Sequence, residues 1–505
     1  RPPHPAEHLT ERDGSVEVLG VQAREAFVVQ ASHLFFLGRE PHGGTVIRNE
    51  GTSVEPAVCW PPSMRGDYVA GAFLEPEGEA LVSVDPAHDG RPVCETAASP
   101  ARVGEAVSAA RTASPAWAAL SVDARFEHLR RFRAAIDAQR EALADAIVKE
   151  IGKIRSEARL EVTSLVGRFD LAFDRVKNDL RSGPLPGFPS EALRWHPHGV
   201  VGVIGPFNFP MHLSHAHIVP ALLLGNTVVL KPSEVAPLCA IRYAEAAHAA
   251  GLPAGVLNVV QGRGPAGAAL AAHPDVRGLA FTGSWPVGRR ILEASLDRPE
   301  MLLALEMGGK NTAIVCEDAE LRQAVHETVV GGYLTTGQRC TCTDRVLVHR
   351  ARRDELVQAL RRVVPTLVFG DPDDARAFAG PLAPAAGRDK LERAITTARE
   401  RGADAIVEGA RLPGGFFRSG SVHLVPPGVH DLPGYTDVEL FGPDLGIETF
   451  DDDDEAIATV DASPYGFACS VFTGSDARFE RYFRGIRLGL LNRNRSTNQA
   501  SPRLP

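Results

Sequence analysis

Short, continuous apolar runs alternate with helical segments through the middle of this 505-residue chain. The runs do not alternate polar with apolar residues, which favours strands buried on both faces of a sheet. The segments between them carry apolar residues at helical spacing. The predicted strands are 200–204, 227–230, 257–260, 279–281, 312–315 and 346–348, and the predicted helices are 240–250, 265–272 and 287–296. This order predicts an α/β fold, with a parallel sheet between layers of helices.

Two segments interrupt this regular pattern. Residues 1–67 are heavily punctuated by Pro, Gly and Ser, and we interpret them as an extension that is a partly ordered appendage or a separate module. Residues 182–198 are rich in Pro and Gly and predict a loop or a protruding hairpin.

A second series of elements follows Glu306 and continues to about Phe483.

Composition excludes several classes of partner. A net charge of −9 and a pI near 6.0 argue against binding to nucleic acid or to an anionic membrane surface. No apolar run approaches the roughly 18 residues that span a bilayer. Seven cysteines without a framework favour a reducing compartment, so we expect a cytoplasmic protein. The chain begins without Met and without an apolar signal core, which leaves a lost targeting signal open.

Cys340 is the candidate nucleophile, in the string Gly337-Gln338-Arg339-Cys340. A thiol attacks as thiolate, and nearby positive charge from Arg339 would lower its pKa. Gly337 allows the backbone to approach a ligand closely. Cys342 is the one serious competitor. We interpret the other cysteines as buried small side chains: Cys59, Cys94, Cys239, Cys316 and Cys469.

Two further polar residues have the chemistry that a sulfur nucleophile needs. Glu306 lies between an apolar run and Gly308-Gly309, where a carboxylate can reach into a cleft and act as general base on water. Asn208 lies in the stiff string Gly205-Pro206-Phe207-Asn208-Phe209-Pro210, and its amide can donate to a developing oxyanion. Together these groups indicate covalent oxidation of an aldehyde.

Three strings are candidates for binding a dinucleotide. Residues 262–267 match G-x-G-x-x-G between a predicted strand and a predicted helix. Gly283-Ser284 also opens a helix after a strand, and its helix N-terminus can hold pyrophosphate equally well. Lys231 and Glu234 follow a third strand, and a carboxylate that faces the ribose 2′-OH favours NAD over NADP.

His212, His215 and His217 form H-x-x-H-x-H, but their spacing does not place all three on one helix face. We therefore expect no metal site. Met211 and His212, directly after the Asn208 loop, are instead candidates to line a substrate cavity.

These motifs resemble the aldehyde dehydrogenase superfamily over residues 68–505. The strings at 198–200, 205–210, 217–222 and 335–342 are most similar to the branch that oxidises N-succinylglutamate 5-semialdehyde, an acidic semialdehyde of arginine catabolism. The resemblance implies an NAD-dependent enzyme that works through a cysteine thiohemiacetal and a thioester. Alternatives are another substrate class, a coenzyme A-acylating dehydrogenase, and a non-catalytic protein with the same fold.

The resemblance also implies a role for individual residues. It makes Cys340 the nucleophile in preference to Cys342, Glu306 the general base and Asn208 the oxyanion donor. The implied cofactor contacts are Phe207, Lys231, Glu234, Gly264 near the adenine, Gly283, Ser284 at the pyrophosphate, Glu439 and Phe441.

The resemblance further divides the chain and predicts a homodimer or homotetramer. The expected segments are the extension 1–67, a helical first part of the NAD-binding domain 68–181, an oligomerisation hairpin 182–198, a Rossmann-like second part 199–305, a catalytic domain 306–483 and a C-terminal oligomerisation segment 484–505. Arg493 and Arg495 depart from the usual pattern. They are candidates to contact the carboxylates of the substrate, and the alternative is that they are surface arginines with structural partners.

Overall fold

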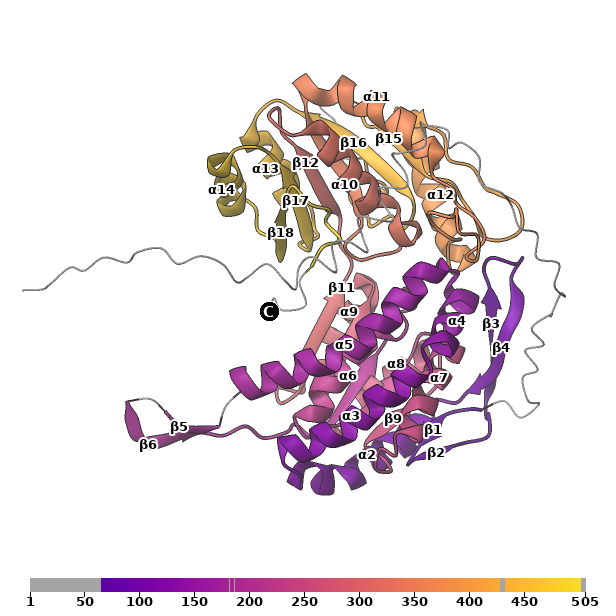
Figure 1. Cartoon of the computed structure of the whole chain (residues 1–505), viewed down its shortest axis with the longest axis vertical. Coiled ribbons are helices and arrows are strands. Elements are labelled where there is room, and N and C mark those ends of the chain that lie inside the picture. Colours follow the sequence, from indigo (N-terminus) through magenta and orange to yellow (C-terminus); the bar gives the residue numbers. More distant parts are fainter. Residues whose placement is uncertain (1–64, 181, 186, 427–431, 501–505) are drawn as a thin grey trace, which may run out of the picture. The chain divides into compact units, whose positions relative to one another are not determined.

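A seven-stranded sheet organises the first part of the computed structural model, which describes residues 65–180, 182–185, 187–426 and 432–500 (Figure 1). The strand order is β11-β10-β7-β8-β9-β1-β2, parallel from β11 to β9 and antiparallel beyond. The strands are β1 (Tyr68–Val69), β2 (Ala72–Phe73), β7 (Val200–Ile204), β8 (Thr227–Lys231), β9 (Leu257–Val259), β10 (Val276–Gly283) and β11 (Leu302–Met307). The predicted extension 1–67 lies almost wholly outside the described residues.

Helices cover both faces of this sheet, as continuous apolar strands predict. On β8, Val228 and Leu230 belong to one hydrophobic core and Val229 to the other. The first core includes residues of α3 (Val122–Ala138), α4 (Arg140–Ile151), α5 (Arg155–Asp179), α6 (His212–Leu223) and α7 (Pro237–Ala249). The second core includes residues of α2 (Arg102–Ala119), α8 (Gly264–Ala272) and α9 (Trp285–Ser295).

A second seven-stranded sheet follows after only Gly308, Gly309 and Lys310. Its order is β14-β15-β16-β13-β12-β17-β18, with every pair parallel except β14 and β15. The strands are β12 (Asn311–Val315), β13 (Thr343–His349), β14 (Asp404–Val407), β15 (Ser421–Leu424), β16 (Asp444–Phe450), β17 (Ala468–Phe472) and β18 (Leu490–Arg493).

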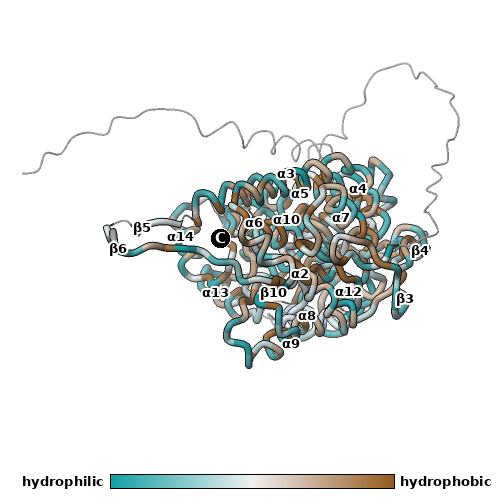
Figure 2. Tube along the Cα trace, turned by 90° about the horizontal axis from the view of Figure 1, so that it is seen from below, coloured by the Kyte–Doolittle hydropathy of each residue, from teal (hydrophilic) through white to brown (hydrophobic). Residues whose placement is uncertain are grey.

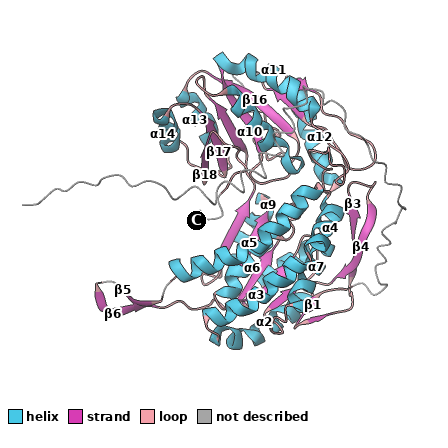
Figure 3. Ribbon diagram, viewed as in Figure 1, coloured by secondary structure: helices cyan, strands magenta, loops and turns pink. Residues whose placement is uncertain are grey.

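Helices also pack on both faces of the second sheet (Figure 3). One core contains residues of α10 (Leu321–Tyr333) and α11 (Arg353–Val363), and the opposite core contains residues of α13 (Asp453–Asp461) and α14 (Asp476–Gly485). The remaining elements are α12 (Ala385–Glu400) and the short 3-10 turns η1 (Leu334–Gly337), η2 (Arg350–Arg352) and η3 (Val364–Thr366). The two parallel-rich sheets with their helices confirm the predicted α/β class.

Two hairpins complete the fold. One joins β3 (Glu79–Asp85) to β4 (Arg91–Ala98), and the other joins β5 (Gly183–Leu185) to β6 (Phe188–Leu193). The second lies in the Pro/Gly-rich segment for which the sequence predicts a loop or hairpin. Figures 1 and 2 show it extending away from the helices, while apolar segments of the chain gather inside.

All six predicted strands are present, but β10 and β13 extend beyond the predicted limits. Arg277 and Gly278 interrupt the apolar run of β10. At the start of β13, Asp344 and Arg345 read as polar although both are buried. Asp344 lies 3.2 Å from Lys310, and Arg345 donates to Glu448 at 2.8 Å. Buried charges with such partners are tolerated in a strand.

No helix among the described residues is both long and apolar enough to cross a bilayer.

Candidate active site

The loop before Cys340 follows an unusual backbone path. Thr335, Thr336 and Gly337 all have positive φ, at 53°, 56° and 71°. Such conformations cost free energy in residues with a side chain and persist only where the surroundings hold them. Thr335 Oγ1 donates to Glu157 Oε1 at 2.7 Å, and Thr336 Oγ1 donates to the Gly380 carbonyl at 2.9 Å.

Gly337 also lies against another loop. A Cβ at this position would come within 2.3 Å of the carbonyl oxygen of Gly442, which is backbone and does not move aside easily. Both the positive φ and the close approach therefore require glycine here.

Side-chain amides hold the backbone carbonyls around the nucleophile. Asn311 Nδ2 donates to the Cys340 carbonyl at 2.7 Å and to the Cys342 carbonyl at 2.9 Å. The buried Asn208 donates from Nδ2 to the Gln338 carbonyl at 2.9 Å. An amide nitrogen carries two N–H groups, so Asn208 keeps one for a ligand oxygen. This geometry is compatible with the predicted oxyanion role.

Cys340 is partly exposed, whereas Cys342 is buried and points its Sγ at the Leu334 carbonyl, 3.9 Å away. Burial, followed by the negative charges of Glu439 and Glu306, raises the pKa of the Cys340 thiol to about 12. Arg339 opposes this only weakly, because its guanidinium donates to Glu157 at 2.8 Å. The free protein therefore holds Cys340 as a protonated thiol at neutral pH.

The other cysteines that the structure describes are buried, as predicted: Cys94, Cys239, Cys316 and Cys469. Cys59 lies outside the described residues.

Two carboxylates influence the thiol. Glu306 is exposed near the end of β11, where it pairs with Thr282 of β10. Glu439 accepts from the Gly309 N–H at 3.4 Å, and a Cβ on Gly308 would lie 2.2 Å from its Oε2. Burial, followed by the charge of Asp344, raises the pKa of Glu439 to about 7. Glu439 affects the thiol more strongly than Glu306 does.

The predicted adenine-ribose contacts follow the carboxyl end of β8, an edge at which parallel sheets bind nucleotides. Lys231 ends β8, is buried, and donates from Nζ to Glu234 Oε2 at 3.1 Å. Burial lowers the pKa of Lys231, so an added hydrogen-bond acceptor such as a ribose hydroxyl would stabilise its ammonium group.

The predicted pyrophosphate contacts lie at the same sheet edge. Gly283 ends β10, and Ser284 precedes the first turn of α9 without capping it by a side-chain hydrogen bond. Pro286 has no N–H, and the Val287 N–H already donates to the Ser284 carbonyl at 3.1 Å, so the Trp285 N–H is the donor that this helix start leaves for an anion. Gly264 begins α8, which follows β9. This donor set fits a dinucleotide.

The residues predicted to lie near the nicotinamide come from two loops that contact each other. The rings of Phe207 and Phe441 meet edge to face with centroids 5.9 Å apart, and Phe441 has a φ of 56°. Phe207 precedes Asn208, and Phe441 follows Glu439 by two residues. The contact therefore connects the oxyanion loop to the loop of the second carboxylate.

The predicted substrate residues fall into two groups. Met211 is buried, and its N–H and that of His212 point at Glu161 Oε1, at 3.4 and 3.2 Å. Arg493 pairs with Asp476 at the start of α14, and Arg495 donates to Gln499 at 2.6 Å. Both arginines thus already bond within the chain.

The described residues contain no group of three metal-ligating side chains.

Sequence reasoning missed the residues that support the loop. Asn311 follows Gly308-Gly309-Lys310 directly, so its position beside the Glu306 string was a usable signal. Nothing in the sequence indicated a role for Glu157, because it lies 178 residues before its partner Thr335.

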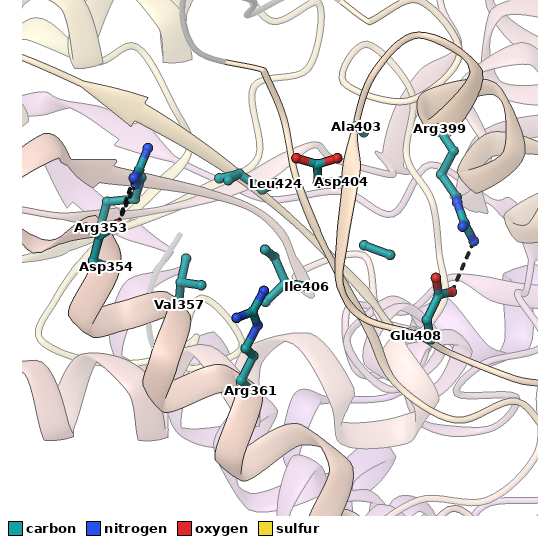
Figure 4. Close-up of a pocket in the computed structure, with 11 residues that line it drawn as sticks. Arg353, Asp354, Val357, Arg361, Arg399, Ala403, Asp404, Ile406, Glu408 and Leu424 are labelled. Carbon is teal, nitrogen blue, oxygen red and sulfur yellow. Dashed lines mark hydrogen bonds and ion pairs between the residues drawn. The ribbon is translucent and has the colours of Figure 1, made fainter.

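A pocket of about 620 Å³ lies elsewhere, between α11, α12 and β14 (Figure 4). Two of its arginines are paired, Arg353 with Asp354 at 2.7 Å and Arg399 with Glu408 at 3.0 Å. None of the predicted site residues lines it.

Residues 73–505 match the model of the aldehyde dehydrogenase family. The chain is 40% identical over 445 residues to an N-succinylglutamate 5-semialdehyde dehydrogenase of Burkholderia pseudomallei, covering 87% of this chain and 90% of the relative. A protein of the same description from Ectopseudomonas mendocina is 38% identical, covering 88% and 91%.

Solved structures agree in fold. An NAD-dependent aldehyde dehydrogenase from Sinorhizobium meliloti superposes with a TM-score of 0.83 at 33% identity, covering 88% of this chain and 89% of that one. An aldehyde dehydrogenase from Pseudomonas syringae, in complex with NAD+ and octanal, gives 0.81 at 31% identity, covering 87% and 90%.

Replacing Gly337 by Ala should reduce NADH formation by at least tenfold, because a Cβ collides with the Gly442 carbonyl and disfavours the positive φ. Gly104→Ala on α2 is the matched control, since a Cβ there meets no atom within 4 Å. We would measure initial rates and thermal stability of both variants. Equal activity of the two would contradict the role assigned to the loop.

Replacing Glu439 by Gln should accelerate alkylation of Cys340 by iodoacetamide about threefold to tenfold at pH 8. Removing the charge lowers the thiol pKa, and each unit changes the thiolate fraction tenfold. At pH 6 the gain should shrink, because Glu439, with a pKa of about 7, is then protonated in the parent protein. Glu480→Gln on exposed α14 is the control. Slower alkylation of the Glu439 variant at pH 8 would refute the electrostatic account.

Proposed function

The chain belongs to the aldehyde dehydrogenase family and is an NAD-dependent oxidoreductase that acts on aldehydes; within that activity we propose a substrate and a role for each site residue. The partly exposed thiol of Cys340 carries the proposal. Asn208 lies beside its loop, and the carboxylates of Glu306 and Glu439 influence its pKa.

Cys340 gives up its S–H proton to solvent as Sγ attacks the aldehyde carbon, and the carbonyl electrons move to oxygen. The remaining N–H of Asn208 donates to that oxyanion. NAD bound at the edge of the first sheet would supply the hydride acceptor. Lys231, Glu234 and Ser284 would hold it there, with Gly264, Gly283, Phe207, Glu439 and Phe441 as further contacts.

Oxidation leaves a thioester on Cys340. Glu306 takes a proton from water, the hydroxide adds to the thioester carbon, and the C–S bond breaks to release the acid and the thiol. Glu306 is exposed at a strand end next to two glycines, which suits a base that must reach a water molecule.

The proposed substrate is an acidic semialdehyde such as N-succinylglutamate 5-semialdehyde. The names of the relatives at 38–40% identity support this choice. Arg493 and Arg495 are the sequence-based candidates for its carboxylates. A coenzyme A-acylating reaction would share the thioester but would not need Glu306.

Cys340→Ala should abolish NADH formation from N-succinylglutamate semialdehyde. Glu306→Gln should instead retain a first burst of NADH, close to one per active site, and then turn over at least tenfold more slowly, because only water attack fails. Stopped-flow absorbance measures both, and the parent enzyme should release free acid without coenzyme A. Activity of the Cys340 variant, a lost burst in the Glu306 variant, or strict dependence on coenzyme A would each refute the mechanism.

We propose a cytoplasmic homodimer or homotetramer. The six described cysteines are all free, and the β5–β6 hairpin offers strand edges for pairing with a second copy. Light scattering after size-exclusion chromatography should give a mass of two or four chains. A strict monomer at micromolar concentration would contradict this assembly.

A further inference from the structure

Helices α5 and α6 lie side by side and share one hydrophobic core (Figure 1). Glu161 Oε1 accepts from the His212 N–H at 3.2 Å, and the Leu165 carbonyl lies 3.1 Å from Nε2 of His215. Arg168 is seven residues after Glu161 and three after Leu165, so helical geometry places it on the side of α5 that faces α6. Its side chain is partly buried.

Arg168 has no hydrogen bond or ion pair with any described residue. Burial and the positive charge of Arg175 lower its pKa, and no carboxylate among the described residues opposes them. Glu161 cannot neutralise it, because Glu161 pairs with Lys153 at 2.7 Å and accepts the N–H groups at the start of α6. A partly desolvated guanidinium without an acceptor is unfavourable, and an anion would relieve it.

Histidines of α6 lie close enough to this guanidinium for its charge to lower the pKa of their rings. Burial, together with the charge of Arg168, lowers the pKa of His212 to about 4 and also lowers the pKa of His217. Both are therefore neutral at pH 7. Nδ1 of His212 is buried and has no hydrogen-bond partner within the described part of the chain. A neutral imidazole can donate one hydrogen bond, so the cluster offers two kinds of unused donor to one ligand.

The cluster lies at a distance that suits a long substrate. Glu157 on α5 accepts from Arg339, the neighbour of Cys340, at 2.8 Å. Arg168 is eleven residues further along α5, about 16 Å along the helix axis. An extended N-acylated amino acid of the proposed size spans about 10 Å, like three extended residues. The long side chain of Arg168 spans much of the remaining distance between the substrate and the helix.

We propose that Arg168, with His212 and His217, binds the distal carboxylate of the substrate, the one on the acyl group. The inference rests on the proposed function, since it deepens the choice of an acidic semialdehyde. Arg168 suits this task better than Arg493 and Arg495, which already bond to Asp476 and Gln499.

The test compares three aldehydes: N-succinylglutamate semialdehyde, N-acetylglutamate semialdehyde, which lacks the distal carboxylate, and hexanal. Arg168→Met should lower kcat/KM for the succinyl substrate by about 10–100-fold, mainly through KM, because a hydrogen-bonded charge pair is lost. Rates with the other two aldehydes should change less than twofold. Arg168→Lys should recover part of the loss. The control Arg159→Met removes an exposed arginine of the same helix, paired with Glu141 at 2.9 Å, and should have no effect.

An equal loss with all three aldehydes, or a selective loss in Arg495→Met instead, would overturn the assignment. A binding measurement separates this inference from the mechanism. Calorimetry of N-succinylglutamate with Cys340→Ala protein should show at least tenfold weaker binding when Arg168→Met is added. If the parent oxidises no aldehyde yet this binding difference persists, the proposed function fails and the anion site stands; equal binding refutes the site.

Discussion

The left-handed path of Thr335, Thr336 and Gly337 is the constraint on which the candidate site depends. Three consecutive residues with positive φ are not stable by themselves, so neighbouring groups must hold them. Glu157, Gly380 and the Asn208 amide bond directly to this loop, and Asn311 bonds to the carbonyls that follow it. Because these partners come from both sheets and from α5, the position of Cys340 depends on the whole described fold.

The electrostatics of the site favour a resting thiol. Burial and two carboxylates keep the Cys340 proton in place. A protonated thiol reacts slowly with oxidants and alkylating agents, since the thiolate is the nucleophile. Changes at Glu439, whose pKa is about 7, therefore provide one way for ligand binding or pH to alter the reactivity of the sulfur.

Along α5, one buried charge is neutralised and a second, partly buried one is not. Lys153 and Glu161 form a buried ion pair. The other carboxylate oxygen of Glu161 accepts a hydrogen bond from the backbone N–H at the start of α6. Two turns further on, Arg168 has no such partner within the described part of the chain. Buried charges without partners are uncommon and are often found where a ligand binds. The same helix thus supports the nucleophile loop at one end through Glu157 and offers a cation further along.

The sequence by itself predicted six of the fourteen strands in the two large sheets, because continuous apolar runs need burial on two faces. It also identified Cys340, Glu306 and Asn208 as chemically suitable residues, since their short strings are weak signals singly but informative together in this order. It missed the full lengths of β10 and β13, where Arg277, Asp344 and Arg345 look like loop residues. Only the tertiary structure showed that Asp344 and Arg345 have buried partners. It alone placed Glu157 and Asn311 beside the loop of the thiol, and it left Arg168 without a carboxylate among the described residues. Those relations join residues far apart in the chain, and no local pattern encodes a distance across the fold.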